Sequence, residues 1–259
     1  MTNDFRSVRI RKESCKEVFV MIGLGTIINT LAILAGGVLG ALFGRFLGES
    51  TQETLNRVCG VSTLFIALSG AMEGMLRVEN GAIVSSGSML IVICLAIGAV
   101  IGEWLDIEGA FERFGQWLKV KSGNTGDQGF VHAFVTASLT VCIGAMAIVG
   151  SIQDGLTGDY SILATKAILD LIIIMVMSCS LGRGAVFSAV PVAVFQGSIT
   201  ALAGLVRPLM TEAALHNLSL VGNVLIFCVG INLLWGKKIK VANLLPAVVI
   251  AVIAAFLPM

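Results

Sequence analysis

Two stretches of this chain align without a gap: residues 36–72 read GGVLGALFGRFLGESTQETLNRVCGVSTLFIALSGAM and residues 196–232 read QGSITALAGLVRPLMTEAALHNLSLVGNVLIFCVGIN. Nine positions are identical at an offset of 160 residues, among them Gly70 and Gly230. Each copy reads as an apolar helix, a short polar linker and a second apolar helix. If an odd number of membrane spans separates the copies, they lie in the bilayer with opposite orientations, as in many secondary transporters.

Composition predicts that the chain spans a membrane. Of the 259 residues, 56% are hydrophobic and 13% are charged, whereas a soluble domain carries about 25% charge. The apolar residues form long runs, and runs of about 20 residues are typical of transmembrane helices. The net charge of +1 excludes the basic face that a nucleic-acid partner requires. The lipid bilayer is therefore the expected partner of this surface.

We predict an all-α fold, a polytopic transmembrane helical bundle of about eight spans with internal, partly inverted helix-linker-helix repeats. Residues 1–20 form a polar tail that we interpret as an upstream extension or a misassigned start, and residues 21–259 form a single transmembrane domain. The expected spans are 22–44, 58–76, 86–105, 130–150, 161–180, 186–206, 218–235 and 241–258.

Two polar, helix-compatible linkers follow the first and third spans, at 45–57 and 106–120. The second is typical of an interfacial amphipathic helix. A weaker third copy of the repeat covers 98–146 and has the orientation of the first. Linkers after odd-numbered spans hold nine Lys and Arg, against two on the other side when the tail is left out. This charge bias favours both ends of the 21–259 domain lying outside.

Four glycines recur every fourth residue on the first span: Gly36, Gly40, Gly44 and Gly48. On a helix they form one flat stripe that lets a second backbone approach. The stripe favours helix packing or the seam of a homodimer; the alternative is a lining for a narrow pathway.

Lys166 and Asp170 are four residues apart on the fifth span, so they share one helix face. Asp170 lies about nine residues into the span, close to the middle of the bilayer. Ionisable groups at that depth are costly and usually face a partner or a cavity. The pair is therefore either structural, each charge neutralising the other, or a site for a substrate or coupling ion.

The segment from Asp154 to Asp159 reads DGLTGD and joins the fourth and fifth spans. Its acids and glycines predict a water-exposed turn; the alternative is a cation-attracting mouth of a pathway.

The sixth span is the least regular one. It contains Pro191, which removes a backbone donor, and the polar residues Ser188 and Gln196. These features favour either a simple proline kink or a discontinuous helix whose freed backbone groups bind solute. Asn29, on the first span, is an amide that needs partners if it is buried; hydrogen bonding between helices is its favoured role, and solute binding is the alternative.

The sequence lacks the residue patterns typical of enzymes and of metal or phosphate sites. No catalytic triad, phosphate-binding loop or metal-binding motif is present, and only two histidines occur, so we expect no enzyme activity, no metal and no cofactor. The six cysteines are scattered without a CxxC pair and are interpreted as small buried hydrophobes.

Several strings occur in an order that resembles a bacterial integral membrane family known as domain of unknown function 554. They are GLGTIIN at 23–29, VIGE at 100–103, GAMAIVG at 144–150, DGLTGD at 154–159, KAILD at 166–170, FSAVPV at 187–192, QG at 196–197 and KIKVANLLPA at 238–247. The resemblance covers about 21–259 and implies a multi-pass protein of the bacterial inner membrane, loosely regarded as a transporter. The resemblance implies no established substrate. Leu171 stands where the family leads us to expect a glycine.

The favoured interpretation is a secondary transporter of a small solute or ion. Lys166 and Asp170 would supply charge, and Asn29, Ser188 and Gln196 would supply hydrogen bonds. The alternatives are a passive channel for ions or small solutes, and a non-transporting membrane scaffold or accessory subunit. An intramembrane enzyme is the weakest alternative.

Overall fold

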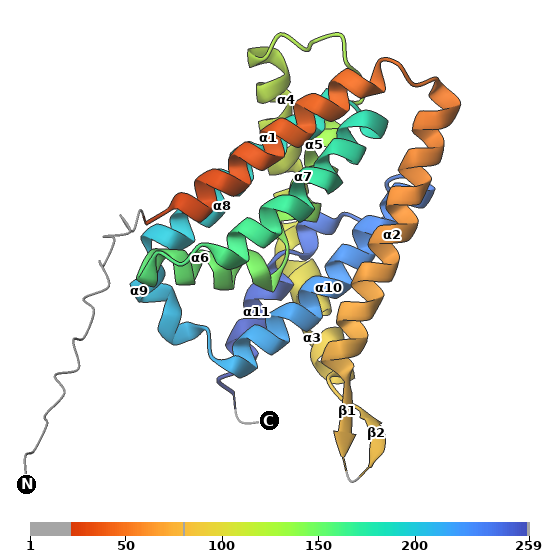
Figure 1. The fold of residues 1–259 in the computed structure, drawn as a ribbon. Coiled ribbons are helices and arrows are strands. Elements are labelled where there is room, and N and C mark those ends of the chain that lie inside the picture. Colours follow the sequence, from red (N-terminus) through yellow and green to blue (C-terminus); the bar gives the residue numbers. More distant parts are fainter. Residues whose placement is uncertain (1–21, 80, 258–259) are drawn as a thin grey trace, which may run out of the picture.

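The chain is described here by a computed structural model, which covers residues 22–79 and 81–257. It is a bundle of helices with one short hairpin at its lower end (Figure 1). The elements, in chain order, are α1 Leu24–Gly44, α2 Glu49–Met75, β1 Leu76–Glu79, β2 Ala82–Ser85, α3 Ser88–Leu105, α4 Ile107–Lys121, α5 Phe130–Cys142, α6 Ala145–Thr157, α7 Ser161–Leu181, the 3₁₀ helix η1 Arg183–Ser188, α8 Ala189–Ala201, α9 Ala203–Val206, the 3₁₀ helix η2 Arg207–Leu209, α10 Glu212–Trp235, the 3₁₀ helix η3 Val241–Leu244, and α11 Pro246–Ala254.

The described residues contain six helices that are long and apolar enough to cross a membrane: α1, α2, α3, α7, η1 with α8, and α10. A seventh crossing is formed if α5 and α6 count as one span, since they meet at a bend of 63°. The apolar segment Val241–Ala254 is shorter. The all-α membrane bundle is thus confirmed, and the eight expected spans correspond to six long helices, one bent pair and one shorter segment.

The glycine stripe of α1 is a seam between helices of the same chain. A Cβ added at Gly36 would overlap the carbonyl oxygen of Leu171, and one at Gly40 would overlap that of Met175, so the two backbones touch. Positions 36 and 40 meet 171 and 175, which makes α1 and α7 parallel. The stripe is therefore closed by α7 and does not offer the dimer seam considered above. No described atom lies within 4 Å of a Cβ at Gly48, which is outside this contact.

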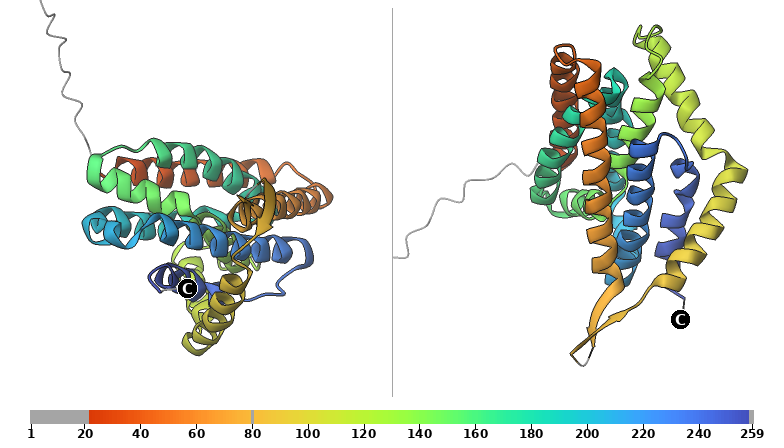
Figure 2. Two further views of the ribbon diagram at one scale, coloured as in Figure 1. Left: turned by 90° about the horizontal axis from the view of Figure 1, so that it is seen from below. Right: turned by 90° about the vertical axis from the view of Figure 1, so that its right-hand side faces the viewer.

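A second layer is built on antiparallel pairs. Gly60 of α2 meets Leu234 of α10, whereas Gly74 meets Leu220. A glycine also allows close packing at α3, where Gly102 lies against the backbone of η3. Figure 2 (right) shows α10 and α11 between α2 on one side and α3 on the other.

The α5–α6 and η1–α8 segments run side by side, and in the described residues only α5–α6 is broken, since Arg183–Ala201 is one continuous helix. Gly184 in η1 packs against the backbone of Phe130 at the start of α5, and Gly155 in α6 packs against the backbone of Thr200 in α8. The α5–α6 and η1–α8 segments are therefore parallel. Gly144, at the break between α5 and α6, has φ 153°, a value that only glycine adopts readily.

Several boundaries expected from the sequence are wrong. Residues 49–57 are the first turns of α2 and not a linker, because this polar stretch extends the helix beyond its apolar part. The predicted continuous span 130–150 is broken at Ile143 and Gly144. The hairpin of β1 and β2 was not expected.

The expected helix over 106–120 is present as α4, which packs on α5 with the Phe114 and Phe134 rings 5.8 Å apart. The predicted tail, 1–20, lies outside the described residues.

The α1–α7 seam leads to a first prediction. Gly40→Ala places a methyl group where the Met175 carbonyl oxygen lies, so α1 and α7 must separate, and overpacking of this kind costs about 1–3 kcal/mol. Gly48→Ala, the same change at the N-cap of α2, where a Cβ meets no atom within 4 Å, is the control. Thermal unfolding in detergent should show a lower Tm for Gly40→Ala only; equal Tm values would contradict the seam.

Candidate functional site

Lys166 and Asp170 form a buried ion pair in α7. The Lys166 ammonium nitrogen lies 2.7 Å from Oδ1 and 2.6 Å from Oδ2 of Asp170. The two side chains are only 10% and 4% exposed. The i, i+4 spacing places both groups on one face of the helix, as the sequence predicted. The pair lies in an apolar part of the bundle, where an unpaired charge would be strongly disfavoured.

Two amides from other helices complete the cluster. Asn29 of α1 donates through Nδ2 to Oδ2 of Asp170 at 3.0 Å and to Oε1 of Gln196 in α8 at 3.2 Å. Asn29 is 0% exposed and Gln196 is 1% exposed. Four residues predicted from the sequence to form a site, on three helices, are thus brought together. We call Asn29, Lys166, Asp170 and Gln196 the polar cluster.

The polar cluster retains unused hydrogen-bonding capacity. Asn29 Oδ1 and Gln196 Nε2 are buried and have no hydrogen-bond partner in the described part of the chain. A free acceptor and a free donor therefore lie next to the ion pair. Buried polar groups are nearly always partnered, so these two atoms could bind a further polar species, such as water or solute, if the cluster opens.

The break between α5 and α6 lies close to this cluster. Helices α5 and α6, on either side of the break, both pack against α7, which carries the ion pair. The first N–H groups of a helix point away from its body and lack partners within it. The break was not expected from the sequence, although Gly144 within an apolar run was a signal for it.

Two further predicted site residues, Ser188 and Asp159, are not part of the polar cluster. Ser188 is buried, but its hydroxyl donates to the Ala185 carbonyl oxygen at 2.7 Å within η1. Asp159 is exposed and accepts from the Ser161 N–H at 3.0 Å, and this bond holds the pKa of Asp159 below its usual value. Both side chains therefore have local structural roles in this conformation.

Asp154 corrects the expected exposed turn. It lies in α6, is 0% exposed, and its Oδ2 accepts from the Gly25 N–H at 3.1 Å. Its Oδ1 is buried with no partner among the described residues. The turn begins later, at Gly158, because the helix continues through the acidic residue. Asp154 therefore ties α6 to the start of α1 and does not form a mouth exposed to water.

The structure also contains two cavities that sequence reasoning did not find. One, of about 790 Å³, lies between α4, α5 and α10 and has charged residues on its α4 side. The other, of about 730 Å³, is apolar and is lined by α4, α8, α10, α11 and the α5–α6 break. Lys166 and Asp170 line neither of them. The ion pair is closed off from both cavities in this conformation.

The described residues contain no group of three or more His, Cys, Asp or Glu side chains that could hold a metal ion. Cys59, Cys94, Cys142, Cys179 and Cys228 are free thiols. Cys15 belongs to the part of the chain outside the description.

The ion pair leads to a prediction on stability. Lys166→Met leaves the Asp170 carboxylate buried without its counter-charge and should cost about 3–5 kcal/mol. The double variant Lys166→Met/Asp170→Leu removes both charges and should recover most of that loss. Tm values of both variants and of Asp170→Leu complete a double-mutant cycle. Additive losses would show that the two side chains do not interact.

Comparison with known proteins agrees with this architecture. The sequence profile of the family described as "Protein of unknown function (DUF554)" matches residues 24–256. The chain is 28% identical over 232 residues to the "Uncharacterized membrane protein YdfK" of Bacillus subtilis, covering 90% of this chain and 95% of that protein. It is 29% identical over 232 residues to the "Uncharacterized protein YqgA" of Escherichia coli, covering 88% and 94%. No solved structure matches. Since the family profile spans nearly all of the helical bundle, the chain belongs to the DUF554 family of membrane proteins.

Proposed function

We propose that this membrane protein is a secondary transporter that moves a small solute or ion, with Lys166 and Asp170 as its coupling pair. The observation that carries the proposal is the polar cluster itself: a buried ion pair joined by Asn29 and Gln196 from two further helices. Charges held inside membrane helices mark substrate or ion pathways in many transporters. The proposal assigns the protein no enzymatic activity, no cofactor and no nucleic-acid partner.

The coupling would depend on competition for the Asp170 carboxylate. In the closed conformation both carboxylate oxygens contact the Lys166 ammonium group. A cation or a proton reaching Asp170 would replace Lys166, and the released ammonium group would need a new partner. Asn29, whose Nδ2 binds the same carboxylate, has a free acceptor in Oδ1 that could serve as this partner. Such an exchange changes which helices are tied together, which is what a coupled conformational change requires.

The interrupted α5–α6 segment supports the same proposal. Non-helical backbone at membrane depth is tolerated where protein or a cavity covers it, and transporters use it to bind ions and solutes. Here the break between α5 and α6 supplies such backbone, and it lies in a segment that packs parallel to the continuous helix formed by η1 and α8. Pro191 lies in the first turn of α8, where its missing N–H has little effect. The sixth span begins as the 3₁₀ helix η1 and continues as α8 without a break, so the discontinuous helix expected as one alternative for this span is wrong.

The inverted repeat is part of the proposal. The α2 and α10 helices, which are the second helices of the two copies, pack antiparallel. The equivalent glycines each face the opposite helix, Gly70 against Asn223 and Gly230 against Leu64. These contacts are those expected when two copies pack about a twofold axis in the membrane plane.

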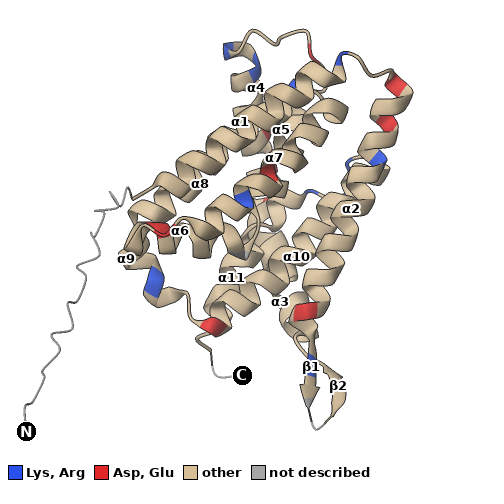
Figure 3. Ribbon diagram, in the orientation of Figure 1, with Lys and Arg blue, Asp and Glu red and all other residues tan. Residues whose placement is uncertain are grey.

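We further propose a bacterial inner-membrane location with the Lys- and Arg-rich end in the cytoplasm. Figure 3 shows Lys and Arg segments gathered mainly toward the upper end of the bundle, with few near the hairpin. Positively charged loops remain on the cytoplasmic side. A homodimer, which the proposal leaves open, would have to use a face other than the Gly36–Gly44 stripe.

One observation favours a non-transporting scaffold as the second candidate. The ion pair lines neither cavity and is fully neutralised, as a structural tie between helices would be. The experiment below separates the two functions, and it also identifies a passive channel by currents that do not saturate.

Neutral replacement of the pair tests the transport proposal. Lys166→Gln/Asp170→Asn keeps the shapes and removes both charges, so the protein should fold and insert but fail to transport. Proteoliposomes on a solid-supported membrane would be challenged in turn with sodium, protons, amino acids and carboxylic acids. The wild type should give saturable currents for one class and the variant none. Full currents in the variant, or no wild-type current with any class, would favour the scaffold.

Cysteine labelling tests the orientation. In a background with the six cysteines replaced by alanine, Ala82→Cys at the hairpin should react with an impermeant maleimide in intact cells. Gly126→Cys, in the loop after α4, should react only after permeabilisation. Both positions are exposed. The reverse pattern would overturn the proposed orientation without affecting the fold.

A further inference from the structure

The 790 Å³ cavity combines a charged wall with an apolar wall. Glu108 and Glu112 of α4 line one side, and Val131, Val135 and Leu139 of α5 line the other. Its volume is within the range of small-molecule sites, about 300–1,000 Å³. It is separate from the polar cluster, whose ion pair does not line it. An amphiphilic ligand would satisfy both walls.

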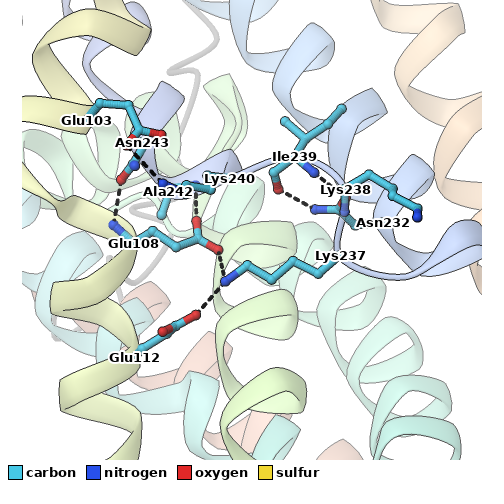
Figure 4. Close-up of polar contacts among 10 residues, drawn as sticks. All are labelled: Glu103, Glu108, Glu112, Asn232, Lys237, Lys238, Ile239, Lys240, Ala242 and Asn243. Atoms are coloured by element: carbon cyan, nitrogen blue, oxygen red, sulfur yellow. Dashed lines mark hydrogen bonds and ion pairs between the residues drawn. The ribbon is translucent and has the colours of Figure 1, made fainter.

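Glu108 and Glu112 both form ion pairs with the ammonium group of Lys237. Figure 4 shows Lys237, from the loop after α10, reaching between Glu108 and Glu112. Its Nζ is 3.0 Å from Glu108 Oε1 and also contacts Glu112. Burial disfavours the charged form of Lys237, but the hydrogen bonds to Glu112 and Glu108 outweigh it and raise the pKa of Lys237. Lys237 is therefore a primary alkylammonium ion already seated in the cavity.

The Glu108 carboxylate is held in place by hydrogen bonds. The Glu108 side chain is 8% exposed, and its Oε2 accepts from the Ala242 N–H at 2.9 Å. The Glu108 N–H donates to Asn243 Oδ1 at 2.7 Å. A buried carboxylate held in this way needs a cation beside it at all times.

The Lys237 side chain, in contrast, is free to move. Lys237 is 43% exposed and follows Gly236, whose φ of 75° suits a glycine turn. The loop is tied to α10 through Asn232, which accepts from the Lys238 and Ile239 N–H groups, and neither bond involves the Lys237 side chain. The lysine side chain can therefore leave without breaking the loop.

The floor of the cavity offers a further polar group. Thr136 is 8% exposed and lines the cavity together with Val135 and Leu139. A hydroxyl both donates and accepts hydrogen bonds, so this residue adds a polar group beside the apolar side chains of the α5 wall.

We propose that this cavity binds a small organic ammonium ion with a short apolar body, whose charged group takes the place of Lys237 between Glu108 and Glu112. The body lies against Val131, Val135 and Leu139, and a polar substituent reaches Thr136. A metal ion fits less well: Asp106, which also lines the cavity, is paired with Arg113, and the described residues contain no group of three or more His, Cys, Asp or Glu that could hold one. The assignment concerns binding and holds whether or not the polar cluster drives transport.

Calorimetric titration of the purified protein with n-butylammonium chloride tests the proposal, with sodium chloride at equal ionic strength as the reference. The wild type should bind n-butylammonium saturably. Glu112→Gln, at a half-exposed position, should weaken binding about tenfold, the effect of losing about 1.4 kcal/mol from a charged hydrogen bond. Lys237→Gln should tighten it by a similar factor, because the competing ammonium group is gone.

Lys240→Gln is the matched control. Lys240 lies in the same loop and pairs with Glu103 at 2.9 Å, but it does not line the cavity. This variant should bind like the wild type. Heat no greater than with sodium chloride, an unchanged affinity in Glu112→Gln, or weaker binding in Lys237→Gln would each overturn the proposal.

The same titration identifies the source of the ammonium group. In nanodiscs of phosphatidylethanolamine, a lipid headgroup that occupies the site would weaken n-butylammonium binding relative to nanodiscs of phosphatidylcholine. Equal affinities in the two lipids would assign the site to a free solute. Both results support a primary ammonium ligand.

Discussion

The close contact between α1 and α7 is the constraint on which the rest of the structure depends. Gly36 and Gly40 let the two backbones touch, and Ser178 of α7 donates to the Gly37 carbonyl oxygen at 2.8 Å. Apolar side chains gain nothing by association within lipid, so close packing and hydrogen bonds must hold helices together there. Because the helices are parallel and in contact, Asn29 lies 3.0 Å from Asp170. Larger residues in the stripe would separate the amide from the carboxylate.

A buried ion pair is a poor means of stabilising a protein. Taking two charges out of water costs about as much as their attraction returns, and apolar replacements are often equally stable. Lys166 and Asp170 are nevertheless held on the most closely packed helix, beside a break in α5–α6 and two amides with unused polar atoms. A purely structural tie needs none of these additions. The arrangement therefore favours a pair that exchanges partners.

The sequence was sufficient for the features set by local spacing. The i, i+4 relation of Lys166 and Asp170 predicted their pairing, and the amide of Asn29 in an apolar run predicted a buried hydrogen-bond partner. The sequence did not reveal what tertiary contacts decide. The DGLTGD segment has turn composition, yet Asp154 is helical because the Gly25 N–H gives its carboxylate a partner. The pairing of Glu108 with Lys237 joins residues 129 positions apart, and no local pattern predicts it.

Carbodiimide labelling of the membrane-embedded protein tests most directly whether Asp170 exchanges partners. Dicyclohexylcarbodiimide partitions into membranes and modifies carboxyl groups that are protonated in an apolar setting. If Asp170 leaves Lys166 during a working cycle, mass spectrometry should find it modified progressively, faster at lower pH and more slowly in the presence of the transported cation. The Lys166→Met variant shows whether the reagent reaches the site. Rapid labelling of that variant, with none in the wild type at any pH, would mean that the pair never opens and that Lys166 and Asp170 are a structural tie.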